Sequence, residues 1–239
     1  MSSVDILSFV ATAVILGLAY IVVCTLNGFL QTWLIDKLGD PTSKKLGYLT
    51  LNPEIHIDLI GFLFCIFFVI GWHMPVPING QEIKGFLRWP RVVAAYLAST
   101  VCALMIALVT LVSSIALFGY SATYRFLSIA LKTQTLDLEH IVHVFEGYSS
   151  LVLLIGLLVA SSIVLNLYIA VLNFIYNMVR FVLFIGTEKS YAYADHSENI
   201  LTYGSLIALF IFREFFAQLF FMIIVRAAYY VTYFLGIVS

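Results

Sequence analysis

Five long apolar stretches dominate this chain and restrict what it can fold into. They cover about residues 6–35, 57–72, 92–120, 148–185 and 200–238. A helix needs roughly 20 apolar residues to cross a bilayer, so the last two stretches are long enough for bent or paired helices. Because 62% of the 239 residues are hydrophobic and only 10% are charged, a water-soluble domain could not bury them. The sequence therefore predicts one all-α, polytopic membrane domain over residues 1–239, with five or six transmembrane helices.

Charge and cysteine content narrow the classes of function. The formal net charge is −1 and the sequence has no cluster of basic residues, so nucleic acid is not an expected partner. Cys24, Cys65 and Cys102 lie within apolar stretches, which favours buried free thiols over a disulfide framework. The first apolar stretch lacks a basic segment before it and a small-residue cleavage site after it, so we expect a retained helix.

Membrane orientation depends on how the second apolar stretch is used. Basic residues lie in the loops on both sides of it, at Lys37, Lys44, Lys45, Lys84, Arg88 and Arg91. If the 16 residues at 57–72 cross the membrane, the two loops face opposite sides. If this stretch re-enters, both loops share one side, which the positive-inside rule assigns to the cytoplasm. The sequence leaves both options open.

Two polar blocks interrupt the apolar pattern. They are GDPTSKKLGYLTLNPEIHIDLIG at residues 39–61 and GWHMPVPIN at residues 71–79. In residue types, order and spacing over about 41 positions, they resemble the site-2 protease family of intramembrane zinc proteases, whose second block reads W-x-x-PVPVN. The matched residues include Gly39, Asp40, Asn52, Pro53, His56, Asp58, Trp72, Pro75 and Pro77. The resemblance implies a site-2-protease-like helical core.

The residue types in the first block also have roles that need no metal. Residues 39–41 can end a helix, because proline lacks the amide donor and disfavours helix before it. Residues 52–53 predict a rigid turn. His56 and Asp58 can hydrogen-bond backbone groups of a non-helical segment at membrane depth, where unpaired amides are costly. We therefore expect this block to shape the fold first.

The zinc-binding motif of the family is absent. In the family, HExxH begins twelve residues before the Gly-Asp pair, and the corresponding residues here are Asn27, Gly28, Phe29, Leu30 and Gln31. Both histidines and the glutamate are replaced. A hydrolytic zinc needs three protein ligands and acidifies a bound water, and neutral amides bind zinc poorly. These replacements predict the loss of the family's hydrolytic chemistry.

The third zinc ligand of the family is an aspartate in a segment like FNLLPIPPLDG. The most similar segment here, residues 172–181, keeps Asn173 but lacks the prolines and places Phe181 at the aspartate position. All three family ligands and the general base are then missing. We therefore expect no bound metal, no cofactor and no catalytic residue of the family kind.

Polar side chains remain where the family's zinc-binding helices would face each other. Asn27 and Gln31 share one helix face. A later stripe carries Ser162, Asn166, Asn173, Asn177 and Arg180. We predict that Asn27 and Gln31 hydrogen-bond to Asn173 or Asn177 and so replace the zinc bridge, at about 0.6–2 kcal/mol each. The alternative is that each stripe faces other partners or a small water-filled cavity.

Two further polar regions are candidates for other roles. Residues 124–146 are amphipathic, which predicts an interfacial helix at the headgroups. His140 and His143 within this segment are alternative candidates for metal binding or a pH response. Arg213 and Glu214 fall in the last apolar stretch, where they mark either a functional polar cluster or a helix end at the membrane surface.

The resemblance and the missing ligands favour a catalytically inactive site-2 protease homologue that acts as a membrane-embedded binding or structural component. Its expected partners are the lipid bilayer and other membrane proteins, as clients or complex subunits. Its expected location is a bacterial inner membrane or an equivalent organelle membrane. The alternatives are a constitutive subunit of a larger membrane complex, a small transporter or channel, and an active metalloprotease with a rebuilt metal site. Such a site would draw on His56, Asp58, His73, His140 or His143.

Overall fold

The computed structural model describes residues 3–132, 147–187, 211, 213–234 and 236. The elements in chain order are α1 (Ser3–Leu38), α2 (Thr42–Lys45), the 3-10 helix η1 (Pro53–Ile55), α3 (Leu59–Phe68), α4 (Arg88–Phe118), α5 (Tyr120–Lys132), α7 (Ser150–Thr187) and α9 (Arg213–Phe234). These residues contain no β-strand, and one isolated antiparallel bridge joins Ile57 to His73. The predicted all-α class is confirmed for this part of the chain.

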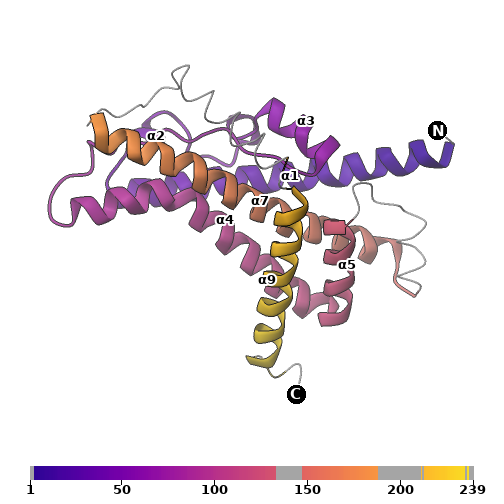
Figure 1. Ribbon diagram of the computed structural model, residues 1–239. Coiled ribbons are helices and arrows are strands. Elements are labelled where there is room, and N and C mark those ends of the chain that lie inside the picture. Colours follow the sequence, from indigo (N-terminus) through magenta and orange to yellow (C-terminus); the bar gives the residue numbers. More distant parts are fainter. Residues whose placement is uncertain (1–2, 133–146, 188–210, 212, 235, 237–239) are drawn as a thin grey trace.

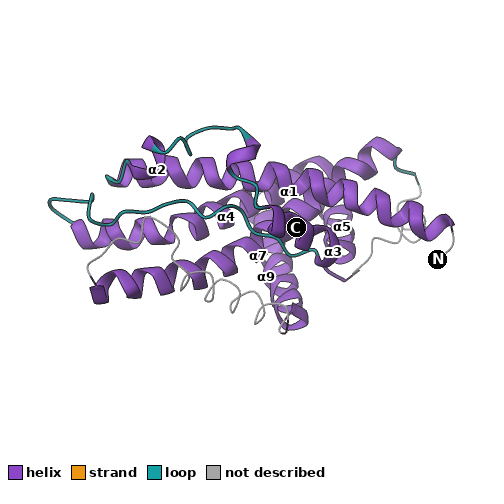
Figure 2. Ribbon diagram, turned by 90° about the horizontal axis from the view of Figure 1, so that it is seen from above, coloured by secondary structure: helices purple, strands orange, loops and turns teal. Residues whose placement is uncertain are grey.

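Three long helices form the frame of the molecule. α4 and α7 pack along each other and α1 lies against both (Figures 1 and 2). Their contacts are mostly apolar: Leu111 of α4 and Val164 of α7 belong to one buried cluster, and Tyr20 of α1 and Ile169 of α7 to a second. α9, yellow in Figure 1, runs steeply across this frame and contacts α4 and α5. The long apolar stretches thus supply the contacts between these helices, while other apolar side chains on them, such as Val14 and Leu108, are exposed.

Among the described residues, three helices are long and apolar enough to cross a membrane: Phe9–Leu38, Arg88–Phe118 and Ser150–Gly186. The predicted stretch 57–72 forms only α3, whose 10 residues rise about 15 Å against a hydrocarbon core of about 30 Å. Asp58 caps the start of α3, and Val69 ends it in the left-handed region, with φ of 60°. Five or six spans are therefore not confirmed by the described residues, which omit part of the stretch 200–238.

Glycines end two of the long helices. Gly39 follows α1 with φ of 103°, and a Cβ there would lie 2.3 Å from Nη2 of Arg91 at the start of α4. Gly119 follows α4 with φ of 80°, and its amide donates to the Ile115 carbonyl at 2.9 Å. Both backbone conformations favour glycine, so the chain turns at these positions.

The described part of the amphipathic segment 124–146 belongs to α5. This helix packs against α4 and α7 and buries Phe126 and Leu127. Phe126 lies over Gly156 of α7, where a Cβ would come within 2.3 Å of the ring. The apolar face of α5 therefore contacts protein. Residues 133–146, on which the prediction of an interfacial helix also depends, lie outside the described residues.

Candidate functional site

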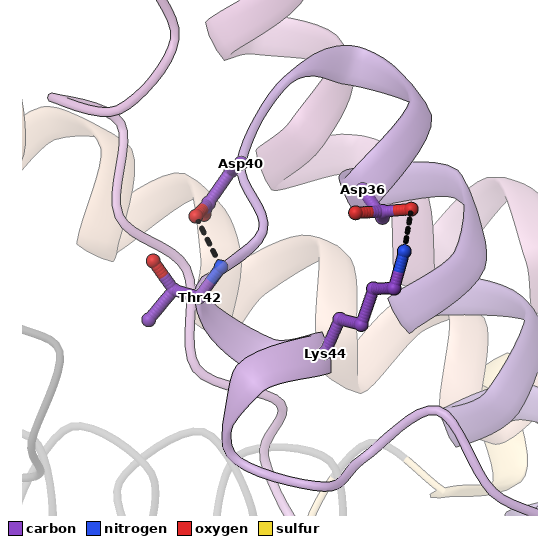
Figure 3. A network of polar contacts seen from close by, with 4 residues as sticks. All are labelled: Asp36, Asp40, Thr42 and Lys44. Atoms are coloured by element: carbon purple, nitrogen blue, oxygen red, sulfur yellow. Dashed lines mark hydrogen bonds and ion pairs between the residues drawn. The ribbon is translucent and has the colours of Figure 1, made fainter.

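Asp40 organises the turn that follows α1. Its carboxylate is fully buried and accepts hydrogen bonds from the backbone amides of Thr42, at 2.9 Å, and Asn79, at 2.5 Å. Figure 3 shows the Thr42 contact next to the ion pair between Lys44 and Asp36, whose atoms are 3.1 Å apart. The ion pair is largely exposed and contributes little. The Asn79 contact ties the start of the first polar block to the end of the second.

The rest of the first block is a series of capped turns. Oδ1 of Asn52 accepts a hydrogen bond of 3.2 Å from an amide of η1, and Oδ1 of Asp58 accepts one of 2.7 Å from Gly61 in α3. His56 is fully buried, and its Nε2 lies 2.9 Å from the carbonyl of Thr50. Because a carbonyl only accepts, this Nε2 carries a proton. His56 and Asp58 thus make the backbone contacts expected of them.

Tyr20 of α1 holds the two blocks together. Its hydroxyl lies 2.6 Å from the carbonyl of Trp72 and 2.9 Å from the carbonyl of Asp58. Two glycines make room for this contact. A Cβ at Gly61 would lie 2.5 Å from the Trp72 carbonyl oxygen, and one at Gly71 would lie 2.8 Å from the Tyr20 ring. Both glycines are therefore required here by close packing.

Asn27 joins α1 to α7, although not through the predicted partners. Its Nδ2 donates to Oδ1 of Asn166 at 2.7 Å and to the Val23 carbonyl at 3.0 Å. Asn173 and Asn177 are also buried, but they lie about two and three turns further along α7. The predicted partner was wrong because the two helices meet Asn27 in a different register.

Asn173 belongs instead to a second buried network, with Ser99 of α4 and His73 of the second block. Its Nδ2 lies 2.6 Å from Oγ of Ser99 and 3.1 Å from Nε2 of His73, and Oγ and Nε2 are 3.1 Å apart. Nδ1 of His73 lies 2.8 Å from the Met74 carbonyl and so carries a proton. Burial lowers the pKa of His73 to about 4, which keeps the ring neutral at neutral pH.

A serine that faces an unprotonated histidine nitrogen is also the arrangement of hydrolase nucleophiles. In this network, however, the Asn173 amide points at both Ser99 and His73, and none of the three side chains is more than 9% exposed. The contacts fasten the second block to α4 and α7. We therefore assign the network a structural role.

Gly28, which the resemblance aligns with the family's general base, lies against the imidazole of His56. A Cβ on residue 28 would come within 2.1 Å of Nδ1 of His56 and within 2.8 Å of its Cγ and Cε1. Non-bonded atoms do not approach this closely, so a side chain at position 28 requires the ring to move. The absence of a Cβ lets the first block close on α1.

Phe181, at the position of the third family ligand, lies in an apolar cluster. It packs beside Ile35 of α1 and Tyr96 of α4, with 5.5 Å between the ring centroids of Phe181 and Tyr96. The neighbouring Arg180 is buried, and its Nη1 lies 3.5 Å from the Val76 carbonyl. Residues 180 and 181 therefore make a backbone contact and apolar contacts, where the family pattern has the aspartate ligand.

This constellation does not fit a zinc ion. Asn27 uses its amide nitrogen for two hydrogen bonds, residue 28 has no side chain and Phe181 is apolar. Among the described residues, no group of three or more His, Cys, Asp or Glu side chains could hold a metal ion. Both ring nitrogens of His73 make other contacts, and so does Nε2 of His56.

Some candidates fall outside what the structure describes. His140 and His143 lie in residues 133–146, and the side chains of Arg213 and Glu214 at the start of α9 are not described either. Sequence reasoning also missed Ser99. A single serine in an apolar helix gives no signal, because it often bonds to a carbonyl of its own helix. Its role depends on the side chains packed opposite.

Comparison with known proteins supports the resemblance loosely. No family model matches the chain and no solved structure gives a significant match. The chain is 36% identical over 69 residues to "Putative zinc metalloprotease YwhC" of Bacillus subtilis (strain 168). The match covers 29% of this chain and 32% of that relative, so the chain spans about a third of the relative's length. Over this region the chain is similar to a protein named as a metalloprotease, and its long apolar helices are those of a membrane protein.

Proposed function

We propose that this chain is a non-hydrolytic relative of the site-2 proteases that serves as a membrane-embedded binding or structural component for other membrane proteins. The observation that carries the proposal is the contact at Gly28. The imidazole of His56, with Nδ1 2.1 Å from the Cβ position of residue 28, fills the space from which a general base would extend.

The chemistry of the neighbouring positions supports the proposal. A hydrolytic zinc site needs three ligands and an open position for water. Asn27 is bound to Asn166, and Phe181 is packed against Tyr96. These groups hold helices together, and none of them is a good zinc ligand. The family's ligand positions have become contacts between α1, α4 and α7.

Buried hydrogen bonds stabilise the frame of long helices on which a binding surface would lie. Asp40, Tyr20 and Asn173 each link elements that are far apart in the sequence. On the outer side of α1, Val14 and Val22 are about half exposed. Such an apolar row suits lipid or a transmembrane helix of another protein. Loss of the metal leaves this surface in place.

Zinc analysis of the detergent-purified full chain tests the loss of hydrolytic chemistry. We expect far less than one zinc per chain, with no difference between the wild type and Asn27→Leu/Gln31→Leu. Zinc near one per chain that is lost in this double variant would contradict the proposal. Zinc that persists in the variant is bound elsewhere and leaves the proposal standing.

Photocrosslinking in cells tests the binding role. A photoreactive residue at Val14 or Val22 of α1 should capture a small set of membrane proteins, whereas the buried position Ala103 should not. A partner at fixed stoichiometry after mild solubilisation would identify a constitutive subunit. Substoichiometric partners would indicate transient clients. Crosslinks to lipid alone would contradict a binding role.

A further inference from the structure

Where α1 meets the first polar block, several buried polar atoms lack described protein partners. Oδ1 of Asn27, Oε1 of Gln31 and Nδ1 of His56 are buried and make no hydrogen bond to any group in the described part of the chain. Their side chains are 0%, 2% and 0% exposed. Polar groups buried this completely are normally paired, because leaving them unpaired is unfavourable.

Two of these atoms are fixed as hydrogen-bond acceptors. Asn27 donates through Nδ2 to Val23 and Asn166, so its remaining polar atom is the carbonyl oxygen. His56 faces the Thr50 carbonyl with Nε2, and the tautomer that this contact selects leaves a lone pair on Nδ1. Gln31, which bonds to no described group, is placed with its amide oxygen buried. Three buried acceptors therefore lack a described donor, and the hydroxyl of Thr32, one turn after residue 28, is a further buried group without a described partner.

Helix geometry brings these atoms to one side of α1. Residues 27 and 31 are one turn apart, and residue 28 lies three positions before residue 31. Residues 27 and 28 point about 100° apart around the helix. Nδ1 of His56 lies 2.1 Å from the Cβ position of residue 28, so it stands in place of a side chain there. Two of the acceptors thus belong to α1, and the third lies against residue 28 of the same helix.

We infer that this acceptor pocket, formed by Asn27, Gln31 and His56, binds one small hydrogen-bond donor, a water molecule or an ammonium ion. Complete burial limits the ligand to very few heavy atoms. Water avoids burying a charge among three neutral groups, whereas ammonium supplies more N–H donors than there are acceptors. The inference rests on the proposed absence of zinc and adds a ligand to that site.

The substitution Gln31→Met tests the pocket, because it removes one acceptor at similar volume and breaks no described hydrogen bond. The unfolding midpoint of the full chain in detergent is compared in NaCl, KCl and NH4Cl at equal concentration. K⁺ matches ammonium in size but has no hydrogen to donate. If ammonium is the ligand, NH4Cl alone raises the wild-type midpoint by about 2–4 °C, and this response is lost in Gln31→Met.

If water is the ligand, the three salts are equivalent and Gln31→Met lowers the midpoint by about 2–4 °C. A midpoint that is unchanged or higher in Gln31→Met, with no ammonium response in the wild type, would overturn the inference, because an empty pocket loses nothing when an unpaired acceptor is removed. Gln218→Met makes the same change at an exposed position of α9 and should be neutral. Zinc near one per chain that is lost in Asn27→Leu/Gln31→Leu would overturn both proposals. A neutral Gln31→Met in zinc-free protein that shows no ammonium response would overturn this one alone.

Discussion

At position 28, the lack of a side chain lets an imidazole from a distant loop pack directly on a long helix. A glycine inside a helix usually lowers stability relative to alanine by about 0.5–1 kcal/mol. Here a Cβ would meet three ring atoms of His56 at 2.1–2.8 Å. The usual preference for alanine should therefore be reversed at this residue.

We expect Gly28→Ala to lower the free energy of unfolding by about 1–3 kcal/mol, because the new methyl group overpacks a buried site. In a His56→Ala background, the same substitution should be neutral or stabilising, by up to about 1 kcal/mol. Chemical unfolding in detergent measures both. Gly186→Ala is the matched control, since this helical glycine has open space around it and alanine there should not destabilise. Equal losses with and without His56 would contradict the contact.

His73 makes stability depend on pH, because burial lowers its pKa to about 4 from an ordinary value of 6.5. The unfolded chain then takes up a proton near pH 6.5, while the folded chain resists it until about pH 4. Stability is therefore fully present above pH 6.5 and falls as the pH drops from 6.5 to 4, by an amount on the order of 3 kcal/mol.

Unfolding midpoints between pH 7 and pH 4 check this expectation, with His73→Gln as the variant that cannot titrate. His73 lies between α3 and α4, outside the three long apolar helices. The wild type should lose more stability on acidification than the variant does. Parallel pH profiles for the two proteins would show that His73 is not held neutral.

At the scale of elements, the helices are connected by a few buried polar contacts that cross between them. The amide contact from Asn27 to Asn166 links α1 to α7 at 2.7 Å, and Asn173 links α7 to Ser99 of α4 at 2.6 Å. Apolar side chains surround both contacts. Several registers of the helices would bury a similar apolar area. These hydrogen bonds favour one register, because a shift would leave the amides unpaired.

A double-mutant cycle tests the link between α1 and α7. Asn27→Leu and Asn166→Leu should each destabilise the protein, and the double variant should lose about 1 kcal/mol less than the sum of the two. Asn27→Leu combined with Asn173→Leu is the control and should be additive, because Asn173 bonds to Ser99 and His73. Coupling in the control pair and additivity in the first pair would contradict the observed register.

At the scale of the whole molecule, the short length of α3 affects the membrane orientation that we predict. With α1, α4 and α7 as the helices that cross, the whole chain from residue 39 to residue 87 lies on one side. This segment contains Lys44, Lys45 and Lys84, and α4 begins at Arg88. For this arrangement, the positive-inside rule predicts that this side faces the cytoplasm.

Cysteine labelling with an impermeant reagent tests this orientation. The native cysteines are buried and free, so they should give little background. Lys45→Cys and Lys84→Cys should react only after the cells are permeabilised, whereas Ser121→Cys, beyond α4, should react in intact cells. All three positions are exposed. Opposite behaviour of Lys45→Cys and Lys84→Cys would mean that the stretch containing α3 crosses the membrane.

Sequence alone determined the features that depend on local chemistry. Long apolar stretches determine an all-α membrane protein, because only paired backbone is stable in lipid. Residues 39–41 and Asn52 predict turns and caps, since proline, glycine and asparagine act on the backbone beside them. The replacement of HExxH by Asn27, Gly28 and Gln31 is likewise visible in the residues themselves.

Tertiary structure decided which of these groups meet. Periodicity placed Asn27 and Asn166 each on a polar helix face, but the register of α1 against α7 depends on the packing of many apolar side chains at once. The approach of His56 to Gly28, and of Phe126 to Gly156, depends on a ring arriving from another element where a Cβ is missing. A sequence records that the side chain is absent. Only the folded chain decides what occupies the space, because that depends on contacts between residues far apart in the sequence.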